Sequence, residues 1–209
     1  MYKRFIDNFG KQGFNCVGSF NIPLLEYEEV DLSKEEISEV VAFNNRKNYI
    51  KATAIHFFID DYQFQRIWNN PSLYIKEFKK YRFICSPDFS LYSDMPLALQ
   101  IFNTYKKQWL ACYYQSKGVT IVPTVSWSTK ESFKFCFDGI SNGMIVSVSS
   151  VGCFKNIESY KLFCVGYQEM IKRINPSKIL FVGKVPEEFE NERIIHIEPF
   201  TKKLEKLKI

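Results

Sequence analysis

The stretch that decides the fold is residues 82–127, RFICSPDFSLYSDMPLALQIFNTYKKQWLACYYQSKGVTIVPTVSW. It begins with a short apolar run and ends with a second one, residues 119–125. Between them, apolar residues recur at helical spacing, which predicts a long helix with Lys106, Lys107 and Gln108 on its other, polar face. A strand, a helix and a strand in this order predict two parallel strands joined by a crossover helix, so that both strands end at one edge of a sheet.

Apolar runs and helical segments alternate on both sides of this stretch. Further strands are predicted at residues 52–59, 144–150, 178–183 and 193–198. Strands that alternate with helices predict an α/β protein with a mostly parallel sheet. Six such units are too few for an eight-stranded barrel, so we expect an incomplete or distorted TIM-barrel-like sheet. An open, doubly wound sheet is the alternative.

The N-terminal part of the chain has the weakest pattern. Residues 16–26 predict a short strand broken by Pro23, and Ser33 with Glu36 has capping-box spacing, which predicts a helix over about residues 34–44. We therefore predict three parts: an N-terminal extension packed on the core, a βα-repeat domain and a basic tail, at residues 1–50, 51–200 and 201–209.

Composition predicts a globular protein, because 46% of the 209 residues are hydrophobic and 24% are charged. No apolar run approaches the roughly 20 residues that a membrane helix needs. The six cysteines form no C-x-x-C pair, which argues against a zinc knuckle or a thioredoxin-type site. Cysteines inside apolar runs and the lack of a signal peptide predict a cytoplasmic protein. The net charge of +5 permits contact with nucleic acid.

Several runs give the chain a family resemblance. They include IHFFIDDYQF (55–64), SPDFSLYSDMP (86–96) and IVPTVSW (121–127), together with residues 66–74, 99–105, 135–140 and 146–152. Over about residues 22–173 the chain resembles the bacterial and phage-borne family catalogued as domain of unknown function 4417. The resemblance implies a setting in prophages, plasmids and other mobile elements of bacteria. It implies no established activity and no catalytic residue.

Acidic residues follow the first two strands of the predicted core. Asp60 and Asp61 follow one strand and Asp88 follows the next, so we expect these carboxylates at one edge of the sheet. We predict all three as catalytic acid/base residues, and Asp60 and Asp88 as ligands of a divalent metal such as Mg²⁺. The structural alternatives are that Asp61 caps a helix and that Asp88 forms an Asx turn.

Other side chains at the same edge are candidates for substrate binding. Trp127 is a candidate platform for a sugar or base, with a lid on the core as the equal alternative. Lys184 is a candidate phosphate contact, and Tyr92, Ser149 and Glu198 complete the predicted binding residues. The chain has no G-x-G-x-x-G or G-K-[ST] motif, which excludes the standard dinucleotide and P-loop sites.

Two classes of function are consistent with these predictions. The first is a metal-assisted hydrolase or processing enzyme that acts on a phosphate-bearing substrate or nucleic acid. The second is a non-catalytic binding protein that modulates a host or phage protein complex through aromatic and basic surface residues. Substitution of Asp60 and Asp88 separates them, because only an enzyme loses activity or stabilisation by Mg²⁺.

Overall fold

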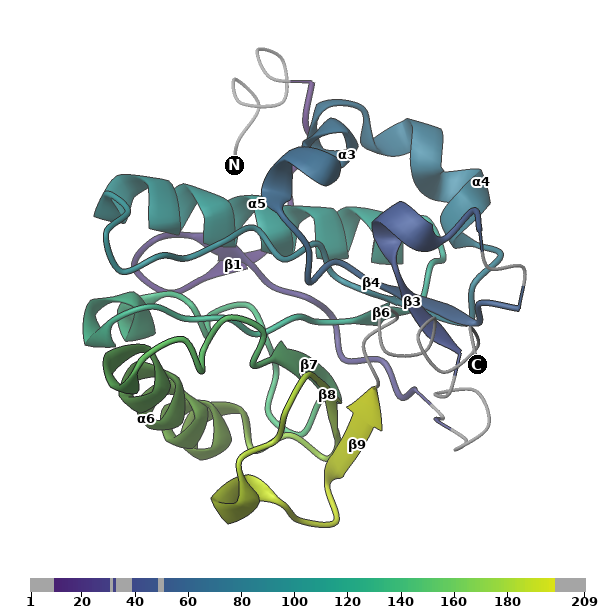
Figure 1. Ribbon diagram of the computed structural model, residues 1–209. Helices are drawn as coiled ribbons and strands as arrows, with labels where there is room; N and C mark the ends of the chain where they lie inside the picture. Colours follow the sequence, from purple (N-terminus) through teal and green to yellow (C-terminus); the bar gives the residue numbers. More distant parts are fainter. Residues whose placement is uncertain (1–9, 31, 33–38, 49–50, 198–209) are drawn as a thin grey trace.

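The computed structural model describes residues 10–30, 32, 39–48 and 51–197 (Figure 1). Its strands are short, and they are β1 (Cys16–Val17), β2 (Ile22–Pro23), β3 (Val40–Ala42), β4 (Ala54–His56), β5 (Phe83–Cys85), β6 (Ile121–Val122), β7 (Val146–Ser149), β8 (Ile179–Val182) and β9 (Ile194–Ile197). The α-helices are α3 (Gln65–Asn69), α4 (Ile75–Phe78), α5 (Leu97–Ser116) and α6 (Ile157–Ile174). Short 3-10 helices are η1 (Phe43–Asn45), η2 (Asp61–Gln63), η3 (Pro71–Tyr74), η4 (Lys130–Lys134) and η5 (Glu187–Phe189).

The strands from β3 to β9 are parallel and follow the order of the chain. One sheet has the order β3-β4-β5-β6 and another has β7-β8-β9. A parallel bridge between Thr124 and Ser147 joins the two sheets. The order never reverses, as it does in a doubly wound sheet. No pairing between β3 and β9 is present in the described part of the chain, so this curved sheet stays open. The predicted α/β class with a mostly parallel sheet is confirmed.

The core lies on both faces of this sheet, because successive side chains of a strand point to opposite faces. Ile55, Ile84 and Ile121 pack on the outer side with α5. On the inner side, residues of both sheets share one apolar cluster, which includes Ala54, Phe83, Val122, Leu180 and Val182. The two sheets therefore share one apolar interior, which is consistent with either a distorted barrel or an open sheet.

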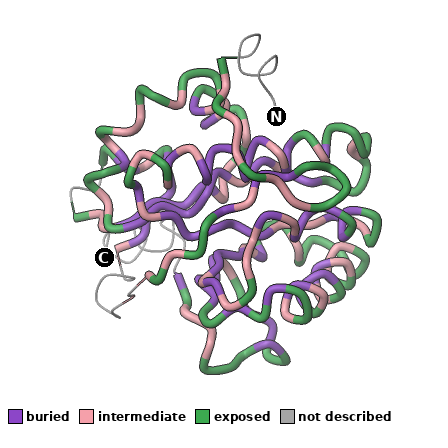
Figure 2. Tube along the Cα trace, turned by 180° about the vertical axis from the view of Figure 1, so that it is seen from behind, coloured by how far each residue is buried: buried purple, intermediate pink, exposed green. Residues whose placement is uncertain are grey.

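The two long helices cover the outer side of the sheets (Figure 1). Figure 2 shows buried residues along the strands and through much of α5, whereas exposed residues lie along the loops and parts of the helices. The Asn156 side chain accepts a hydrogen bond from the Ser159 amide at 2.8 Å and caps α6, which ends at the left-handed Asn175. No helix formed by the described residues has the length and apolar character needed to span a bilayer.

The N-terminal prediction needs correction. Val40–Ala42 forms β3, parallel to β4, where the sequence predicted the end of a helix. Pairing with β4 buries these residues, and β-branched valines suit a strand, so tertiary contacts override the helical spacing. Ser33 and Glu36 of the predicted helix, Glu198 and the tail at residues 201–209 lie outside the described residues. β3 precedes the boundary predicted at residue 51, and the division into three parts stays a prediction.

Candidate functional site

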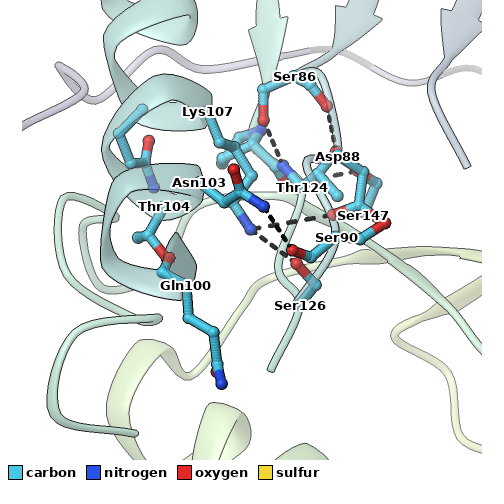
Figure 3. A network of polar contacts seen from close by, with 12 residues as sticks. Ser86, Asp88, Ser90, Gln100, Asn103, Thr104, Lys107, Thr124, Ser126 and Ser147 are labelled. Carbon is cyan, nitrogen blue, oxygen red and sulfur yellow. Dashed lines mark hydrogen bonds and ion pairs between the residues drawn. The ribbon is translucent and has the colours of Figure 1, made fainter. Parts of the chain in front are cut away.

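A buried lysine on α5 is the centre of a polar cluster at the carboxyl ends of β5 and β6 (Figure 3). The side chain of Lys107 is completely buried, and its Nζ donates a hydrogen bond to Ser126 Oγ at 2.8 Å. The same nitrogen lies 3.9 Å from Oδ1 of Asp88. An amine, a hydroxyl and a carboxylate from three segments of the chain therefore converge.

Asp88 is the least satisfied member of this cluster. Its Oδ1 is buried and accepts no hydrogen bond from any described residue, although 18% of the side chain is exposed. Burial raises the pKa of Asp88, while the Lys107 charge and the Ser126 hydroxyl act against the rise and the Asp61 charge adds to it. Unpaired buried acceptors are rare in proteins, and perturbed pKa values gather at functional sites.

The Lys107 ammonium experiences the opposite effect. Burial lowers its pKa, and the negative charge of Asp88 opposes this shift. Desolvation destabilises the charged forms of Lys107 and Asp88, and the attraction between the two charges offsets part of this cost. A carboxyl group and an amine whose pKa values move in opposite directions form a candidate acid/base pair.

Asp61 connects the end of β4 to the loop that carries Asp88. Its carboxylate accepts hydrogen bonds from the Ser90 amide at 3.1 Å and from Ser90 Oγ at 2.7 Å. The Asn103 side chain, one helical turn before Lys107, donates to the Ser90 carbonyl at 2.8 Å. Asp61 therefore anchors this loop, and its charge acts on both Asp88 and Lys107.

Buried hydroxyl groups next to this cluster form hydrogen bonds that connect the ends of β5 and β6 with β7. The Thr124 amide donates to Ser86 Oγ at 2.8 Å, and Thr124 Oγ1 donates to the Ser86 carbonyl at 2.7 Å. Ser147 Oγ lies 2.9 Å from Thr124 Oγ1. Burial raises the pKa of the Cys85 and Cys136 thiols to about 12. Both thiols stay protonated near neutral pH, so neither is a thiolate nucleophile.

Two of the predicted site residues lie apart from this cluster. Asp60 is exposed at the start of η2, and its side chain makes no capping hydrogen bond. It takes part in none of the described contacts around Lys107, so the acidic pair that the structure brings together is Asp61 and Asp88. Tyr92 lies in the loop between β5 and α5 with 56% of its surface exposed.

The Trp127 ring packs against α6. It stacks on Phe163 with ring centroids 5.5 Å apart. A Cβ added to Gly166 would lie 2.1 Å from the Trp127 ring, so the indole occupies the space that this glycine leaves. These contacts support the lid alternative for Trp127.

The remaining predicted residues follow β7 and β8. Ser149 Oγ accepts the Val151 amide at 3.1 Å within a turn. Lys184 is exposed, and its Nζ lies 5.5 Å from the centroid of the Phe154 ring. Within residues 10–30, 32, 39–48 and 51–197, no three His, Cys, Asp or Glu side chains are grouped so that they could hold a metal ion. The prediction of a metal at Asp60 and Asp88 stays untested.

The sequence pattern places Lys106, Lys107 and Gln108 on the polar face of the crossover helix, and the structure shows that this face is also covered. All three are buried. The reason is that loops distant in sequence cover this side of α5. Lys107 Nζ donates to Ser126 Oγ, and Lys106 Nζ lies 3.8 Å from the centroid of the Phe89 ring. Gln108 Nε2 donates to the Asp138 carbonyl at 3.3 Å. A helical pattern shows one apolar face, and it does not reveal a second cover contributed by a distant segment.

Fold and site together define a parallel α/β protein with a candidate acid/base site at the carboxyl ends of its strands. The chain belongs to the family described as "Domain of unknown function (DUF4417)", whose model matches residues 14–200. The resemblance noted from the sequence is thereby confirmed.

Two curated relatives are phage proteins. The chain is 39% identical over 132 residues to the "Gene 1 protein" of Mycobacterium phage L5, covering 63% of this chain and 58% of the relative. It is 38% identical over 136 residues to the "Gene 1 protein" of Mycobacterium phage D29, covering 65% and 50%. The matches thus span less than two thirds of either relative. No solved structure matches the chain. The relatives confirm the predicted link to phage.

Proposed function

We propose that the protein is a hydrolase or processing enzyme for a phosphate-bearing substrate, with its active site around Lys107, Ser126 and Asp88. The observation that carries this proposal is the 2.8 Å contact between the buried Lys107 amine and the partly exposed Ser126 hydroxyl. A hydroxyl within hydrogen-bond reach of a base, with a third group beside that base, is the arrangement that activates a serine nucleophile.

Each residue has a role in this mechanism. Because burial lowers the pKa of Lys107, its ammonium loses a proton more readily than that of an exposed lysine. The neutral amine then accepts the Ser126 proton as the oxygen attacks phosphorus. Asp88 then stabilises the ammonium that has formed, and Lys107 returns the proton to the leaving oxygen as the bond between that oxygen and phosphorus breaks. Water next attacks the phosphoserine while Lys107 accepts its proton, and Lys107 returns this proton to the Ser126 oxygen as phosphate is released. Asp61 positions the loop through Ser90 and acts on the reaction through Asp88.

The predicted Mg²⁺ is a separate question. Magnesium is commonly held by one or two carboxylates together with substrate phosphates and waters, and Asp61 with Asp88 could supply the carboxylates. The positive charge of Lys107 beside Asp88 opposes a second cation there. We therefore assign the neutralisation of developing negative charge to Lys107 and test Mg²⁺ directly.

The test uses p-nitrophenyl phosphate and bis(p-nitrophenyl) phosphate as reporter substrates, with added Mg²⁺ or with EDTA. We expect Ser126→Ala and Asp88→Asn to lose about a hundredfold or more of the rate, since acid/base groups contribute at least this much. Asp60→Asn is the matched control, because it removes a neighbouring exposed carboxylate and should leave the rate unchanged.

Two results would contradict the proposal. One is a Ser126→Ala variant as active as the wild type. The other is a loss in Asp60→Asn as large as in Asp88→Asn. Dependence of the wild-type rate on Mg²⁺ would restore the metal to the mechanism.

A binding protein without catalysis is the second candidate, and one observation favours it. The loops and helix starts at the carboxyl ends of the strands expose large apolar side chains, namely Tyr62, Tyr92, Leu97, Leu99, Phe102, Val151, Phe154 and Ile157. Exposed apolar groups of this kind are typical of protein interfaces. A stoichiometric protein partner retained by both Ser126→Ala and Asp88→Asn would favour this candidate.

A cytoplasmic location is part of the proposal. Cys85, Cys112, Cys136, Cys153 and Cys164 are free thiols, which is typical of proteins in a reducing compartment. The proposal also keeps nucleic acid among the phosphate-bearing substrates.

A further inference from the structure

Basic residues gather at the end of the sheet opposite the candidate active site. Residues 46–53, 76–82 and 117–120 lead into β4, β5 and β6, and they contain eight lysines and arginines. We call this the amino-end basic surface; its members are Arg46, Lys47, Lys51, Lys76, Lys79, Lys80, Arg82 and Lys117. All but Arg46 and Lys117 are exposed. The chain around α4, at the right of Figure 1, carries half of them.

The three segments form one surface. Adjacent parallel strands begin at the same edge, with Ala54 opposite Phe83 and Ile84 opposite Ile121. The Arg82 amide donates to the Thr53 carbonyl at 2.8 Å. Lys79 Nζ would lie 3.7 Å from a Cβ placed on Gly118, so the Lys79 side chain reaches the segment that leads into β6.

Among the described residues, the lysines of this surface outnumber the acidic residues near them. Glu77 is the sole acidic residue between positions 71 and 82, and Arg46 pairs with it at 2.7 Å. Lys76, Lys79 and Lys80 stand at i, i+3 and i+4, a spacing at which like charges repel. Acidic neighbours of the other segments are Glu28, which accepts from Thr120 Oγ1 at 3.2 Å, and Glu39, whose carbonyl accepts from Thr53.

The carboxyl end of the sheet has the opposite charge. The loops after β4 and β5 carry Asp60, Asp61, Asp88 and Asp94 and no lysine or arginine. The segment after β8, residues 183–192, has four glutamates and one lysine. The net charge of +5 is therefore unevenly distributed, and a polyanion is attracted to the amino end of the sheet.

We propose that the amino-end basic surface binds the phosphate backbone of a nucleic acid. Lysine and arginine bind phosphates without regard to sequence, and nucleic-acid interfaces are strongly basic. The described residues of these three segments include no exposed large apolar side chain. Protein interfaces have an apolar core depleted in lysine, and interfacial membrane helices insert apolar groups, so neither partner fits as well. The surface does not use Ser126, Lys107 or Asp88, so this proposal and the catalytic one can fail separately.

The experiment compares two triple charge reversals by fluorescence anisotropy. Lys76→Glu, Lys79→Glu and Lys80→Glu alter the basic surface, while Lys130→Glu, Lys155→Glu and Lys161→Glu alter exposed lysines elsewhere. Both variants change the net charge equally. The probes are a fluorescein-labelled oligodeoxythymidine and a labelled mixed-sequence duplex, titrated over a range of salt concentrations.

We expect the first variant to bind the probes at least about tenfold more weakly at low salt. The slope of the logarithm of the binding constant against the logarithm of the salt concentration should decrease in magnitude by about two to three. The second variant should bind nearly as the wild type does. Should the first variant fail to fold by circular dichroism, Lys79→Gln with Lys80→Gln supplies the same comparison with a reduced effect.

Three results would overturn the proposal. The wild type could fail to bind either probe at low salt. Both triple variants could lose affinity equally, which would show an effect of net charge alone. The wild type could bind vesicles of phosphatidylserine and phosphatidylcholine more tightly than the oligonucleotides, which would assign the surface to a membrane.

Discussion

Lys107 shows how a single residue can be costly to bury and still be retained. Its amine is withdrawn from water and receives one hydrogen bond partner, Ser126, and one ion-pair partner, Asp88. Buried ion pairs contribute little net stability, because desolvation offsets their attraction, yet removal of one partner leaves a buried charge uncompensated. The pair is therefore better explained by chemistry than by stability.

Removal of the amine alone should be the most damaging change at this site. We expect Lys107→Met to destabilise the fold by about 3–5 kcal/mol, because the Asp88 carboxylate loses its counter-ion. Lys107→Met with Asp88→Asn should recover most of this loss. Lys161→Met, an exposed substitution on α6, is the control and should change stability by no more than about 0.5 kcal/mol. Urea unfolding measures all three.

The loss of folding stability caused by Lys107→Met should also depend on pH. Asp88 has a folded pKa above its ordinary value of 3.8, so the folded state binds its proton more tightly than the unfolded state does. The stability that protonated Asp88 contributes is fully present below the pKa of the unfolded state. It is lost as pH rises through the pKa of the folded state. The destabilisation should therefore be largest at neutral pH and shrink on acidification. A loss that is constant with pH, or a double variant as unstable as Lys107→Met, would contradict this account.

At the scale of elements, sequence patterns predicted the strands more accurately than they predicted the segments that pack on them. Apolar runs predicted β4, β5, β6, β7, β8 and β9, and the predicted crossover helix matches α5. Runs rich in Val, Ile and Phe bounded by Gly, Pro and Asp carry a local signal that needs no partner. β3 was missed because its identity as a strand depends on pairing with β4.

The contact of α6 with Trp127 offers a test of packing at this scale. An alanine in place of a helical glycine ordinarily stabilises by up to about 1 kcal/mol. At Gly166 the added Cβ would lie 2.1 Å from the Trp127 ring, and overpacking costs about 1–3 kcal/mol. We expect Gly166→Ala to destabilise the protein in urea unfolding.

A second background gives the control for this prediction. With Trp127→Leu the ring is gone, so Gly166→Ala should become neutral or stabilising there. Stabilisation by Gly166→Ala in the wild-type background would show that Trp127 does not occupy this space.

At the scale of the whole molecule, the parallel sheet separates two kinds of surface. Its carboxyl end brings acidic loops and the Lys107 cluster together, and its amino end gathers the lysines and arginines. A parallel sheet makes this separation simple, because every strand contributes its first residues to one edge and its last residues to the other. Catalysis and nucleic-acid binding are therefore proposed for opposite ends.

The candidate site was only partly predictable from the sequence, for a geometric reason. The rule that parallel strands end together correctly brought Asp61 and Asp88 to one place. It could not choose between Asp60 and Asp61, because adjacent residues at a strand end turn in different directions. It could not find Lys107 either, since that residue comes from a helix and its burial depends on contacts with the loops that carry Ser126 and Asp88.

The central claim is that Asp88 shares a site with Asp61 and Lys107 and not with Asp60. The most direct test is an NMR titration of the Asp88 carboxyl carbon in the wild type, Asp61→Asn and Asp60→Asn. We predict an Asp88 pKa above its ordinary value of 3.8, a lower one in Asp61→Asn because a neighbouring negative charge is gone, and no change in Asp60→Asn. An ordinary Asp88 pKa in the wild type, or a response to Asp60→Asn as large as to Asp61→Asn, would contradict the account.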